Sequence, residues 1–536
     1  MLYKLSLTLS ILCFILSILN PSYYPPWSSF ISEYLAFLSL LFLLPLFIRN
    51  TVSIPKISLF FILLSIIPMF EYSFGQIFYF DKAVLSFIYI ISFWLAIIIG
   101  FNSVNRYKYS LDYFFLVIMG CGLLSSFIAV AQWLNIGMSI DWVMVAQSRP
   151  SANMAQPNHL ATFLLLSLIS CAYFYQNRRI NTIVLVVSSL LLLSAIALTQ
   201  SRTAWVSLLF IAIYWSVMYR KSLFNFSYKK IVLFVSYFIA VAISFPNLKE
   251  KVFGLAPVTI AQRASSGYER IQIWQQAIEA IKQQPLWGYG WNQSSFAQYE
   301  TLQPGYVTRY LTSFHNIFLD ILVWCGIPIG ATIIIACVFI VLKLLIKSVT
   351  VCQICLITSV CVILIHSLFE FPLSYSYFLL PLGFMLGYLF FTINSHYIQI
   401  RGLYFLLIFS LGIGLSLFIA REYSYIPDNM VAAETYEMNE VKGKDTAIFP
   451  YHLYFFDTFD SRARWISLYP CTEMKQSEID NIKSMVKTYM IHYDLYKFSQ
   501  LLYFNGNKVE AEKHLYMLNY MYKKDFKTND LQCNDD

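Results

Sequence analysis

Charged residues are scarce in this chain. Of its 536 residues only 12% are Asp, Glu, Lys or Arg, whereas 58% are hydrophobic. Because about a quarter of the residues in soluble domains are charged, this balance excludes a single water-soluble core. The net charge of +8 is also uneven, since residues 421–536 hold 14 basic and 18 acidic side chains, which leaves +12 for the rest. That balance does not indicate nucleic-acid binding.

Patterns typical of metal and nucleotide sites are also missing. Eight of the ten Cys lie in apolar segments, and the single CxxC, "CQIC" at 352–355, has no second pair. The "GYG" at 288–290 predicts a turn, and no Gly-rich phosphate loop is evident. The sequence therefore predicts no cofactor, no metal and no nucleic-acid partner. Cys471 and Cys533, in the polar C-terminal segment, could pair with each other.

Long hydrophobic runs, in contrast, are abundant. A bilayer core of about 30 Å needs roughly 20 helical residues, so such runs predict an all-α polytopic membrane protein. Thirteen runs are predicted to be spans, and twelve is the alternative because the third run is short. No small-residue cleavage site follows the first run, which argues against a cleaved signal peptide. The thirteen predicted spans are 5–19, 31–48, 57–70, 83–100, 111–134, 159–175, 180–198, 203–219, 230–245, 316–342, 351–369, 372–392 and 401–420.

The basic residues between the runs predict the orientation. If the N-terminus is cytoplasmic, Lys4 and the inner connectors together carry 14 Lys and Arg, whereas the short outer loops carry only three. Cytoplasmic loops collect Lys and Arg, so this asymmetry favours that orientation. The stretch "RPSANMAQPNHLATF" at 149–163, the loop 246–315 and everything after residue 420 are then expected on the outer side.

These features predict four regions along the chain. N-terminal transmembrane helices occupy 1–245, and the outer loop occupies 246–315. C-terminal transmembrane helices follow over 316–420, and a soluble helical domain over 421–536. In the loop, apolar residues at three- and four-residue spacing predict an amphipathic helix that Pro285 and Gly288 end. The tail predicts two amphipathic helices joined at 505–507.

Polar residues gather at the predicted outer ends of the spans. A charge at membrane depth costs from about 3 to more than 10 kcal/mol, so such residues usually face a cavity and have a function. The first cluster, in "RPSANMAQPNHLATF", separates two apolar runs, and the second, in "TQSRTAW", lies between two spans. The third, in "GYERIQIW", starts the loop helix, and the fourth, in "TSFHNIFLDILVWCGIPIG", begins a span. A His and a Glu four residues apart in "HSLFEFPLSY" are expected on one helix face. The candidates are Arg149, Asn153, Gln156, Asn158, His159, Arg202, Arg270, His315, Asn316, Asp320, His366 and Glu370.

Each candidate also has a structural interpretation. Arg202 could reach lipid phosphates, His159 could only cap a helix, and Asp320 could only join neighbouring helices. His366 and Glu370 could be a structural pair. The convergence of several Arg, amides and His on one face favours a functional site that binds a phosphorylated lipid.

The residue types suggest a reaction. Arg presents a planar fork of donors that matches phosphate oxygens, and two Arg could hold a diphosphate and stabilise the charge that develops as it leaves. A His can remove a proton from an acceptor hydroxyl. Together these groups suit the transfer of a sugar from a lipid diphosphate to a hydroxyl.

The sequence resembles a known family over nearly its whole length. "MAQPNHLATFL", "SRTAW", "ERIQIWQQAIEAIKQQPLWGYGWNQ" and "FHNIFLDILVWCGIPIG" resemble the O-antigen ligase/polymerase (Wzy_C) superfamily of bacterial inner-membrane proteins. "AQPNHLAT", "HSLFEFPLSY" and the long tail are similar to its protein O-oligosaccharyltransferase branch, the PglL-like enzymes and pilin glycosylases. The resemblance implies a GT-C-like fold and a metal-independent, inverting transfer of a glycan from undecaprenyl diphosphate to Ser or Thr of a pilin or another exported protein.

The resemblance also implies roles for particular residues. Arg202 and Arg270 would hold the diphosphate, and His315 would be the base. Gln156 and Tyr375 would be further functional positions in the glycosylating branch. Relatives often have a Glu shortly before the Gly of "WCG", where this chain has Trp324, so a role of that Glu does not carry over.

Three other functions stay open at this point. An O-antigen ligase acting on lipid A core, and a polymerase extending a lipid-linked glycan, would use the same Arg and His. A non-enzymatic lipid flippase or transporter would need ionisable residues near mid-span, and no inverted repeat of broken helices is apparent. Polar residues concentrated at one face favour an enzyme.

Overall fold

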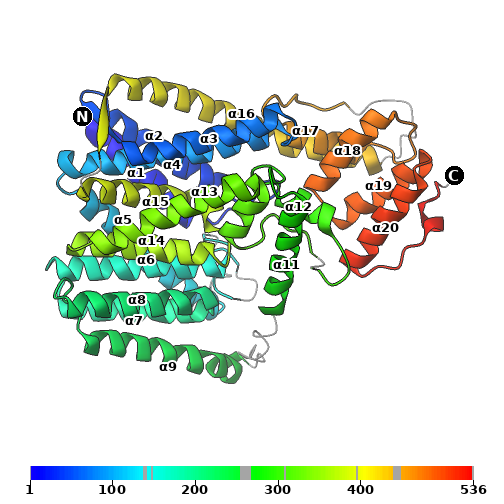
Figure 1. Cartoon of the computed structure of the whole chain (residues 1–536). Coiled ribbons are helices and arrows are strands. Elements are labelled where there is room, and N and C mark those ends of the chain that lie inside the picture. The colour runs from blue at the N-terminus through cyan, green and yellow to red at the C-terminus, as the bar shows by residue number, and fades with distance from the viewer. Residues whose placement is uncertain are drawn as a thin grey trace. The chain divides into compact units, whose positions relative to one another are not determined.

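The described part of the chain is mostly helical. The computed structural model (Figure 1) describes residues 2–136, 142–145, 149–253, 267–306, 309–393, 396–438 and 448–533. Small parts of the predicted loop 246–315 and of the predicted tail 421–536 lie outside these residues. The strands β1 and β2, Thr51–Pro55 and Tyr397–Arg401, form one antiparallel pair.

The described α-helices lie on both sides of residues 254–266. Those that precede residue 254 are α1 Leu2–Leu19, α2 Phe30–Leu43, α3 Leu59–Ser73, α4 Phe80–Arg106, α5 Ser110–Trp133, α6 Pro157–Gln176, α7 Thr182–Thr199, α8 Arg202–Arg220 and α9 Tyr228–Phe253. The later helices are α11 Gly267–Gln283, α12 Ser294–Thr301, α13 Ile317–Lys347, α14 Val351–Ser367, α15 Ser376–Thr392, α16 Leu403–Met438, α17 Asp457–Ser467, α18 Gln476–Thr488, α19 His492–Phe504 and α20 Lys508–Tyr522.

The helices confirm a multi-pass membrane protein. Within the described ranges, ten are long and apolar enough to cross a bilayer, and three shorter apolar helices lie at Tyr3–Leu19, Val351–Ser367 and Ser376–Thr392. Each of the thirteen predicted segments therefore contains an apolar helix. The number of crossings stays a prediction, because the three shorter helices fall below the usual length.

The chain divides into two compact units. The first contains Met1–Leu64, Tyr89–Arg263 and Ala336–Ser416, and the second contains Ser65–Ile88, Ala264–Ile335 and Leu417–Asp536. Helix α6 is the central helix of the first unit, because 89% of its span is buried and it packs against α5, α7, α8 and α14. This packing fixes the N-terminal end of α6, where "QPNH" begins the helix.

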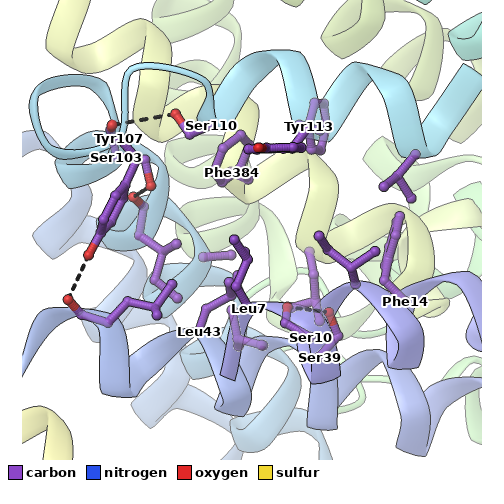
Figure 2. Close-up of a pocket in the computed structure, with 18 of the residues that line it drawn as sticks. Leu7, Ser10, Phe14, Ser39, Leu43, Ser103, Tyr107, Ser110, Tyr113 and Phe384 are labelled. Atoms are coloured by element: carbon purple, nitrogen blue, oxygen red, sulfur yellow. Dashed lines mark hydrogen bonds between the residues drawn. The ribbon is translucent and has the colours of Figure 1, made fainter. Parts of the chain in front are cut away.

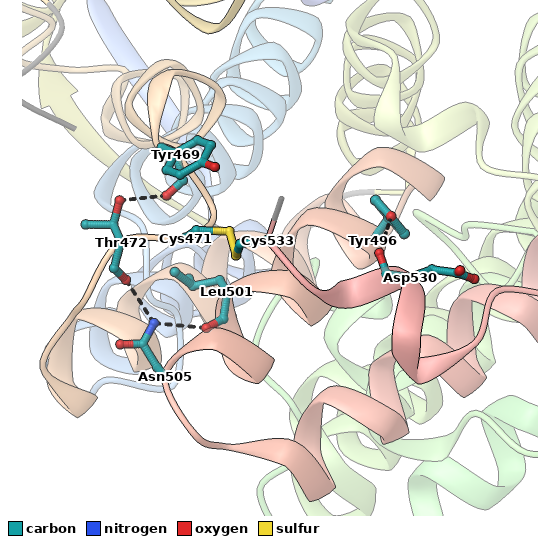
Figure 3. The surroundings of a disulfide bond; sticks show 8 residues. All are labelled: Tyr469, Cys471, Thr472, Tyr496, Leu501, Asn505, Asp530 and Cys533. Atoms are coloured by element: carbon teal, nitrogen blue, oxygen red, sulfur yellow. Dashed lines mark hydrogen bonds between the residues drawn. A yellow bond between two sulfur atoms is a disulfide. The ribbon is translucent and has the colours of Figure 1, made fainter. Parts of the chain in front are cut away.

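The second unit joins part of the loop to the tail. Helix α11 confirms the predicted amphipathic helix, and α19 and α20 confirm the predicted helical hairpin. Cys471 and Cys533 form a disulfide across a sequence separation of 62 residues (Figure 3). Disulfides persist in oxidising compartments, so this bond agrees with an outer location for the tail.

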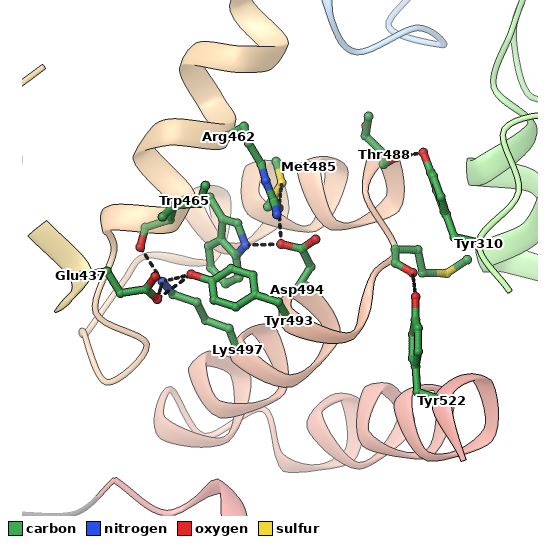
Figure 4. A network of polar contacts seen from close by, with 12 residues as sticks. Tyr310, Glu437, Arg462, Trp465, Met485, Thr488, Tyr493, Asp494, Lys497 and Tyr522 are labelled. Carbon is green, nitrogen blue, oxygen red and sulfur yellow. Dashed lines mark hydrogen bonds and ion pairs between the residues drawn. The ribbon is translucent and has the colours of Figure 1, made fainter. Parts of the chain in front are cut away.

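A buried polar network anchors the hairpin (Figure 4). Asp494 of α19 is fully buried and accepts hydrogen bonds from Arg462 and from Trp465 Nε1 of α17, the latter at 2.8 Å. Lys497 Nζ donates to Glu437 at the end of α16 at 2.9 Å. Burial raises the pKa of Asp494, and the Arg462 guanidinium opposes that rise. Buried charges must be paired, so the network specifies how α19 lies against α16 and α17.

Lowering the pH is expected to destabilise the second unit through His514. This side chain is fully buried, donates from Nδ1 to the Glu510 carbonyl at 2.8 Å and accepts at Nε2 from Tyr299. Burial lowers its pKa from 6.5 to about 4. The unfolded chain therefore takes up the proton first, so the stabilisation is complete above pH 6.5 and decreases as the pH falls toward 4, by about 3 kcal/mol in all.

Thermal unfolding at pH 7 and pH 5 measures this effect. The melting temperature of His514→Gln is expected to change less with pH than that of the wild type. His452→Gln, at an exposed tail position, is the matched control and should keep the wild-type dependence. Equal pH dependence in the wild type and His514→Gln would contradict the assignment.

Candidate active site

A polar cluster lies where α6 and α15 begin, within the first unit. Gln156 Nε2 donates to the Tyr375 hydroxyl at 3.2 Å, and Asn158 Nδ2 donates to Glu370 Oε1 at 2.9 Å. Gln156 directly precedes α6, and Tyr375 directly precedes α15. The structure thus brings together four predicted residues from two stretches more than 200 positions apart.

Two predicted His lie deeper in the same region. His159 Nδ1 is 3.0 Å from the Tyr377 hydroxyl, and His366 Nδ1 is 2.9 Å from Thr162 Oγ1. Both rings are fully buried, and their centroids are 5.5 Å apart. They join α6 to α14 and α15, which supports the structural interpretation of His159.

The prediction that His366 and Glu370 share a helix face is wrong. Helix α14 ends at Ser367, so Glu370 lies beyond it. Pro372 disfavours a helical conformation in the residue before it, and the helix ends ahead of that pair. The two side chains consequently reach different partners, Thr162 for the His and Asn158 for the Glu.

The connector that carries Gln156 is held by a residue that the sequence interpretation missed. Gln132 of α5 accepts from the backbone N–H of Ser151 at 3.0 Å and of Ala152 at 2.8 Å. Asn153 is buried and donates to the Leu19 carbonyl at 2.8 Å. Asn153 therefore has a structural role, and only the residues from Gln156 onward reach the cluster.

Two Arg border the turn between α7 and α8, also in the first unit. Arg149 Nη1 donates to the carbonyl of Thr199, the last residue of α7, at 3.3 Å. Arg202 is the first residue of α8 and is exposed. A helix N-terminus attracts anions through its unsatisfied N–H groups, so this corner combines guanidinium groups with a favourable dipole.

A second polar cluster lies around His315, within the second unit. Arg309 Nη2 is 3.3 Å from His315 Nε2, and Arg309 Nε is 2.8 Å from Glu269 Oε1. A guanidinium can only donate, so Nε2 is the acceptor, and the neutral ring carries its proton on Nδ1. Arg270 follows Glu269 in α11, and Asn316 caps α13 by accepting from the Phe318 N–H at 3.0 Å.

Asp320 organises the backbone at His315. Its carboxylate accepts from Ser313 Oγ at 2.6 Å, from the Phe314 N–H at 2.8 Å and from Ser294 Oγ at 3.2 Å. Ser313 Oγ in turn accepts the N–H of His315 at 2.9 Å. His315 has a φ of +55°, a conformation that is uncommon for a residue with a side chain, and these bonds hold it there.

The segment at 285–290 docks onto a break in α13. Gly326 is non-helical with a φ of +71°, and a Cβ there would lie 2.3 Å from the Leu286 carbonyl oxygen. The N–H groups of Tyr289 and Gly290 donate to the carbonyls of Val323 and Trp324, both at 2.9 Å. The "GYG" is thus more than a turn. Trp324, close to this break, donates from Nε1 to Ser294 Oγ at 2.9 Å. Ser294 also donates to Asp320, so the break is linked to the hydrogen bonds around His315.

Asp320→Ala is expected to reduce, but not abolish, the sugar transfer that the sequence predicts. The substitution leaves three donors without their acceptor, which costs about 1–3 kcal/mol for each buried group and lets the backbone at His315 relax. We expect a lower maximal rate with little change in the apparent affinity for the predicted lipid diphosphate, and Asp320→Asn should lie between Ala and the wild type. Unchanged kinetics in folded Asp320→Ala would show that Asp320 only stabilises α13.

No group of three or more His, Cys, Asp or Glu suited to a metal ion occurs among the residues that the structure describes. The polar groups in the two clusters are amides, hydroxyls, guanidiniums, imidazoles and isolated carboxylates. Such a set suits hydrogen bonding to an anion and proton transfer.

The fold defines the chain as a multi-pass helical membrane protein. Family models match it as "O-Antigen ligase" over residues 187–335, "Virulence factor membrane-bound polymerase, C-terminal" over 354–532 and "Protein glycosylation ligase" over 150–174. It is 34% identical over 534 residues to a General O-oligosaccharyltransferase of Acinetobacter baylyi, covering 96% of this chain and 92% of that protein. It is 28% identical over 373 residues to a ComP-specific O-oligosaccharyltransferase of the same organism, covering 68% and 67%.

The chain therefore belongs to the O-oligosaccharyltransferase family, and it is a glycosyltransferase. This confirms the resemblance inferred from the motifs. The O-antigen ligase match contains Arg202, Arg270 and His315, and the protein glycosylation ligase match contains Gln156.

Proposed function

We propose that this enzyme transfers a complete glycan from undecaprenyl diphosphate to a Ser or Thr hydroxyl of an exported protein, such as a pilin. The observation that carries the proposal is the similarity over 96% of the chain to a General O-oligosaccharyltransferase. Support from the structure comes from polar side chains that gather at the ends of apolar helices, where an amphiphilic donor and a soluble acceptor can meet.

The proposed reaction is an inverting, metal-independent substitution. The acceptor hydroxyl oxygen attacks the anomeric carbon of the glycan and forms the new C–O bond. The bond between that carbon and the diphosphate oxygen breaks, and the lipid diphosphate leaves with the electron pair. His315 takes the hydroxyl proton, so the lone pair on Nε2 is the group that the reaction requires.

Arg309 links the proton transfer to binding of the donor in this proposal. It donates to Nε2 of His315, and its side chain is 51% exposed. A negatively charged donor would attract Arg309 and leave Nε2 to the acceptor hydroxyl. In the proposal, binding of the diphosphate therefore activates the base.

Arg202 and Arg270 hold the diphosphate in the proposal, with Arg149 as a further donor beside Arg202. Guanidinium groups retain their charge and match phosphate oxygens with two parallel bonds. The charge on the leaving diphosphate grows as the bond breaks, so these contacts are stronger in the transition state than in the ground state.

Gln156→Ala is expected to lower glycan transfer about tenfold, the effect of one well-placed hydrogen bond. The amide orients the Tyr375 hydroxyl, so Tyr375→Phe should cause a similar loss, and the double variant little more than either. Gln176→Ala, at the other end of α6, is the matched control. Transfer at the wild-type rate by Gln156→Ala, at equal abundance in the membrane, would contradict the assignment.

The proposed location is the bacterial inner membrane, with a cytoplasmic N-terminus and an outward-facing active site and tail. Support comes from the asymmetry of basic residues between connectors and from the disulfide in the tail.

A deletion strain separates the proposal from its alternatives. Loss of glycan from exported proteins, with unchanged lipopolysaccharide and unchanged glycan length, supports protein glycosylation. Loss of O-antigen from lipid A core would show a ligase. Shortened lipid-linked glycans would show a polymerase.

A further inference from the structure

The first unit contains a cavity apart from the polar cluster. It has a volume of about 660 Å³ and lies between α1, α2, α4, α5 and α15 (Figure 2). It contacts α15 at Leu380, Pro381 and Phe384. Helix α15 begins after Tyr375, and a helix rises about 1.5 Å per residue. The cavity therefore lies farther along α15 than the cluster does.

Most of the wall is apolar. Leu7, Phe14, Leu43 and Phe384 line it, as Figure 2 shows. Helices α1 and α2 contribute a pair of buried hydroxyls, Ser10 and Ser39, whose oxygens are 3.2 Å apart and satisfy each other. This part of the cavity thus suits a hydrocarbon chain.

One end of the cavity is basic. Lys4 lies in the first turn of α1, Arg106 ends α4, and Lys108 lies just before α5. None of the described residues that line the cavity is acidic. The positive charge at this end therefore has no carboxylate beside it in the lining.

Arg106 is partly desolvated at this end. Its Nη2 donates to the Thr51 carbonyl, and its guanidinium lies 5.3 Å from the centre of the Phe47 ring. Its Nη1 is buried and has no hydrogen-bond acceptor among the described residues. A buried donor without an acceptor destabilises the folded chain, and a bound anion would supply the missing acceptor.

We propose that this cavity binds an anionic phospholipid. The cations and Nη1 of Arg106 hold the phosphate, and one acyl chain occupies the apolar part. The anionic head group of such a lipid matches the basic end of the cavity, and its acyl chain matches the apolar part. Lys4, Arg106 and Lys108 are also among the residues that predict the cytoplasmic side, where anionic lipids attract basic groups. The site is thus distinct from the donor site, and this proposal does not depend on the reaction.

Lipid binding to the purified full-length chain tests the proposal. Native mass spectrometry in detergent would compare phosphatidylglycerol with phosphatidylcholine of the same acyl chains. The wild type should prefer phosphatidylglycerol, and Arg106→Gln/Lys108→Gln should weaken its binding about 25-fold, at roughly fivefold for each cation. The control, Arg220→Gln/Lys221→Gln, removes two cations at the end of α8 and should bind as the wild type does.

A second variant tests the apolar part. Ser10→Phe fills the cavity without changing charge and should reduce binding, and its melting temperature reports whether it remains folded. Wild-type affinity in folded Ser10→Phe would overturn the assignment to the cavity. Equal binding of the two lipids by the wild type, or an equal loss in the control, would overturn the proposed head-group recognition. Preferential binding of undecaprenyl phosphate would overturn the choice of phospholipid.

Discussion

His315→Ala is expected to lower the rate of glycan transfer by about 10²–10⁴-fold, the usual contribution of a general base. The ring has an Nε2 that accepts from Arg309, and the backbone is held by Ser313 and Asp320. With Nε2 accepting from Arg309, a neutral ring carries its proton on Nδ1. The measurement is the initial transfer rate with purified enzyme, lipid-linked glycan and an acceptor protein.

The control for this variant is His452→Ala. That His is exposed in the tail, and it should leave the rate unchanged. Equal abundance of both variants in the membrane shows that folding is intact. A rate for His315→Ala within a factor of three of the wild type would remove His315 from the mechanism and leave the base unassigned.

Arg202→Gln is expected to lower transfer by about 10²–10³-fold, because in the proposed reaction it removes a charge that stabilises the leaving diphosphate. Arg202→Lys should lose less, since it keeps the charge but not the planar fork. Arg220→Gln, at the far end of the same helix, is the matched control. The rates should be measured at saturating donor, so that a defect in the chemical step is separated from weaker binding.

This series also tests the structural interpretation of Arg202. A side chain that only reaches lipid phosphates would tolerate Gln with little change in rate. Wild-type turnover by Arg202→Gln would favour that interpretation, and Arg149 would then become the first candidate at the turn between α7 and α8.

The sequence predicted the helices well because a helix that crosses a bilayer needs a run of roughly 20 mostly apolar residues. Each predicted span contains an apolar helix, and the amphipathic period over 267–283 also predicted α11. The error at Glu370 has a local cause. A spacing of four places two residues on one face only while the helix continues, and α14 ends before Glu370 because Pro372 follows.

Long-range partners could not be read from the sequence. No spacing in the sequence predicts the contacts of Gln132 and Arg309, or the hydrogen bond between Ser313 and Asp320. The docking of Gly288 against Gly326 also joins segments almost 40 positions apart. Motif resemblance selected the candidate site residues, whose roles stay predictions, but the residues that hydrogen-bond to them and hold their backbone appear only in the folded chain.

The intact mass of an acceptor protein tests the central claim most directly. The purified enzyme would be incubated with undecaprenyl-diphosphate-linked glycan and an exported acceptor such as a pilin, with a chelator present. The account predicts a single mass increase equal to the whole glycan, located on a Ser or Thr and absent with His315→Ala. An unmodified acceptor, a mass increase of one sugar at a time, or full transfer by His315→Ala would contradict it.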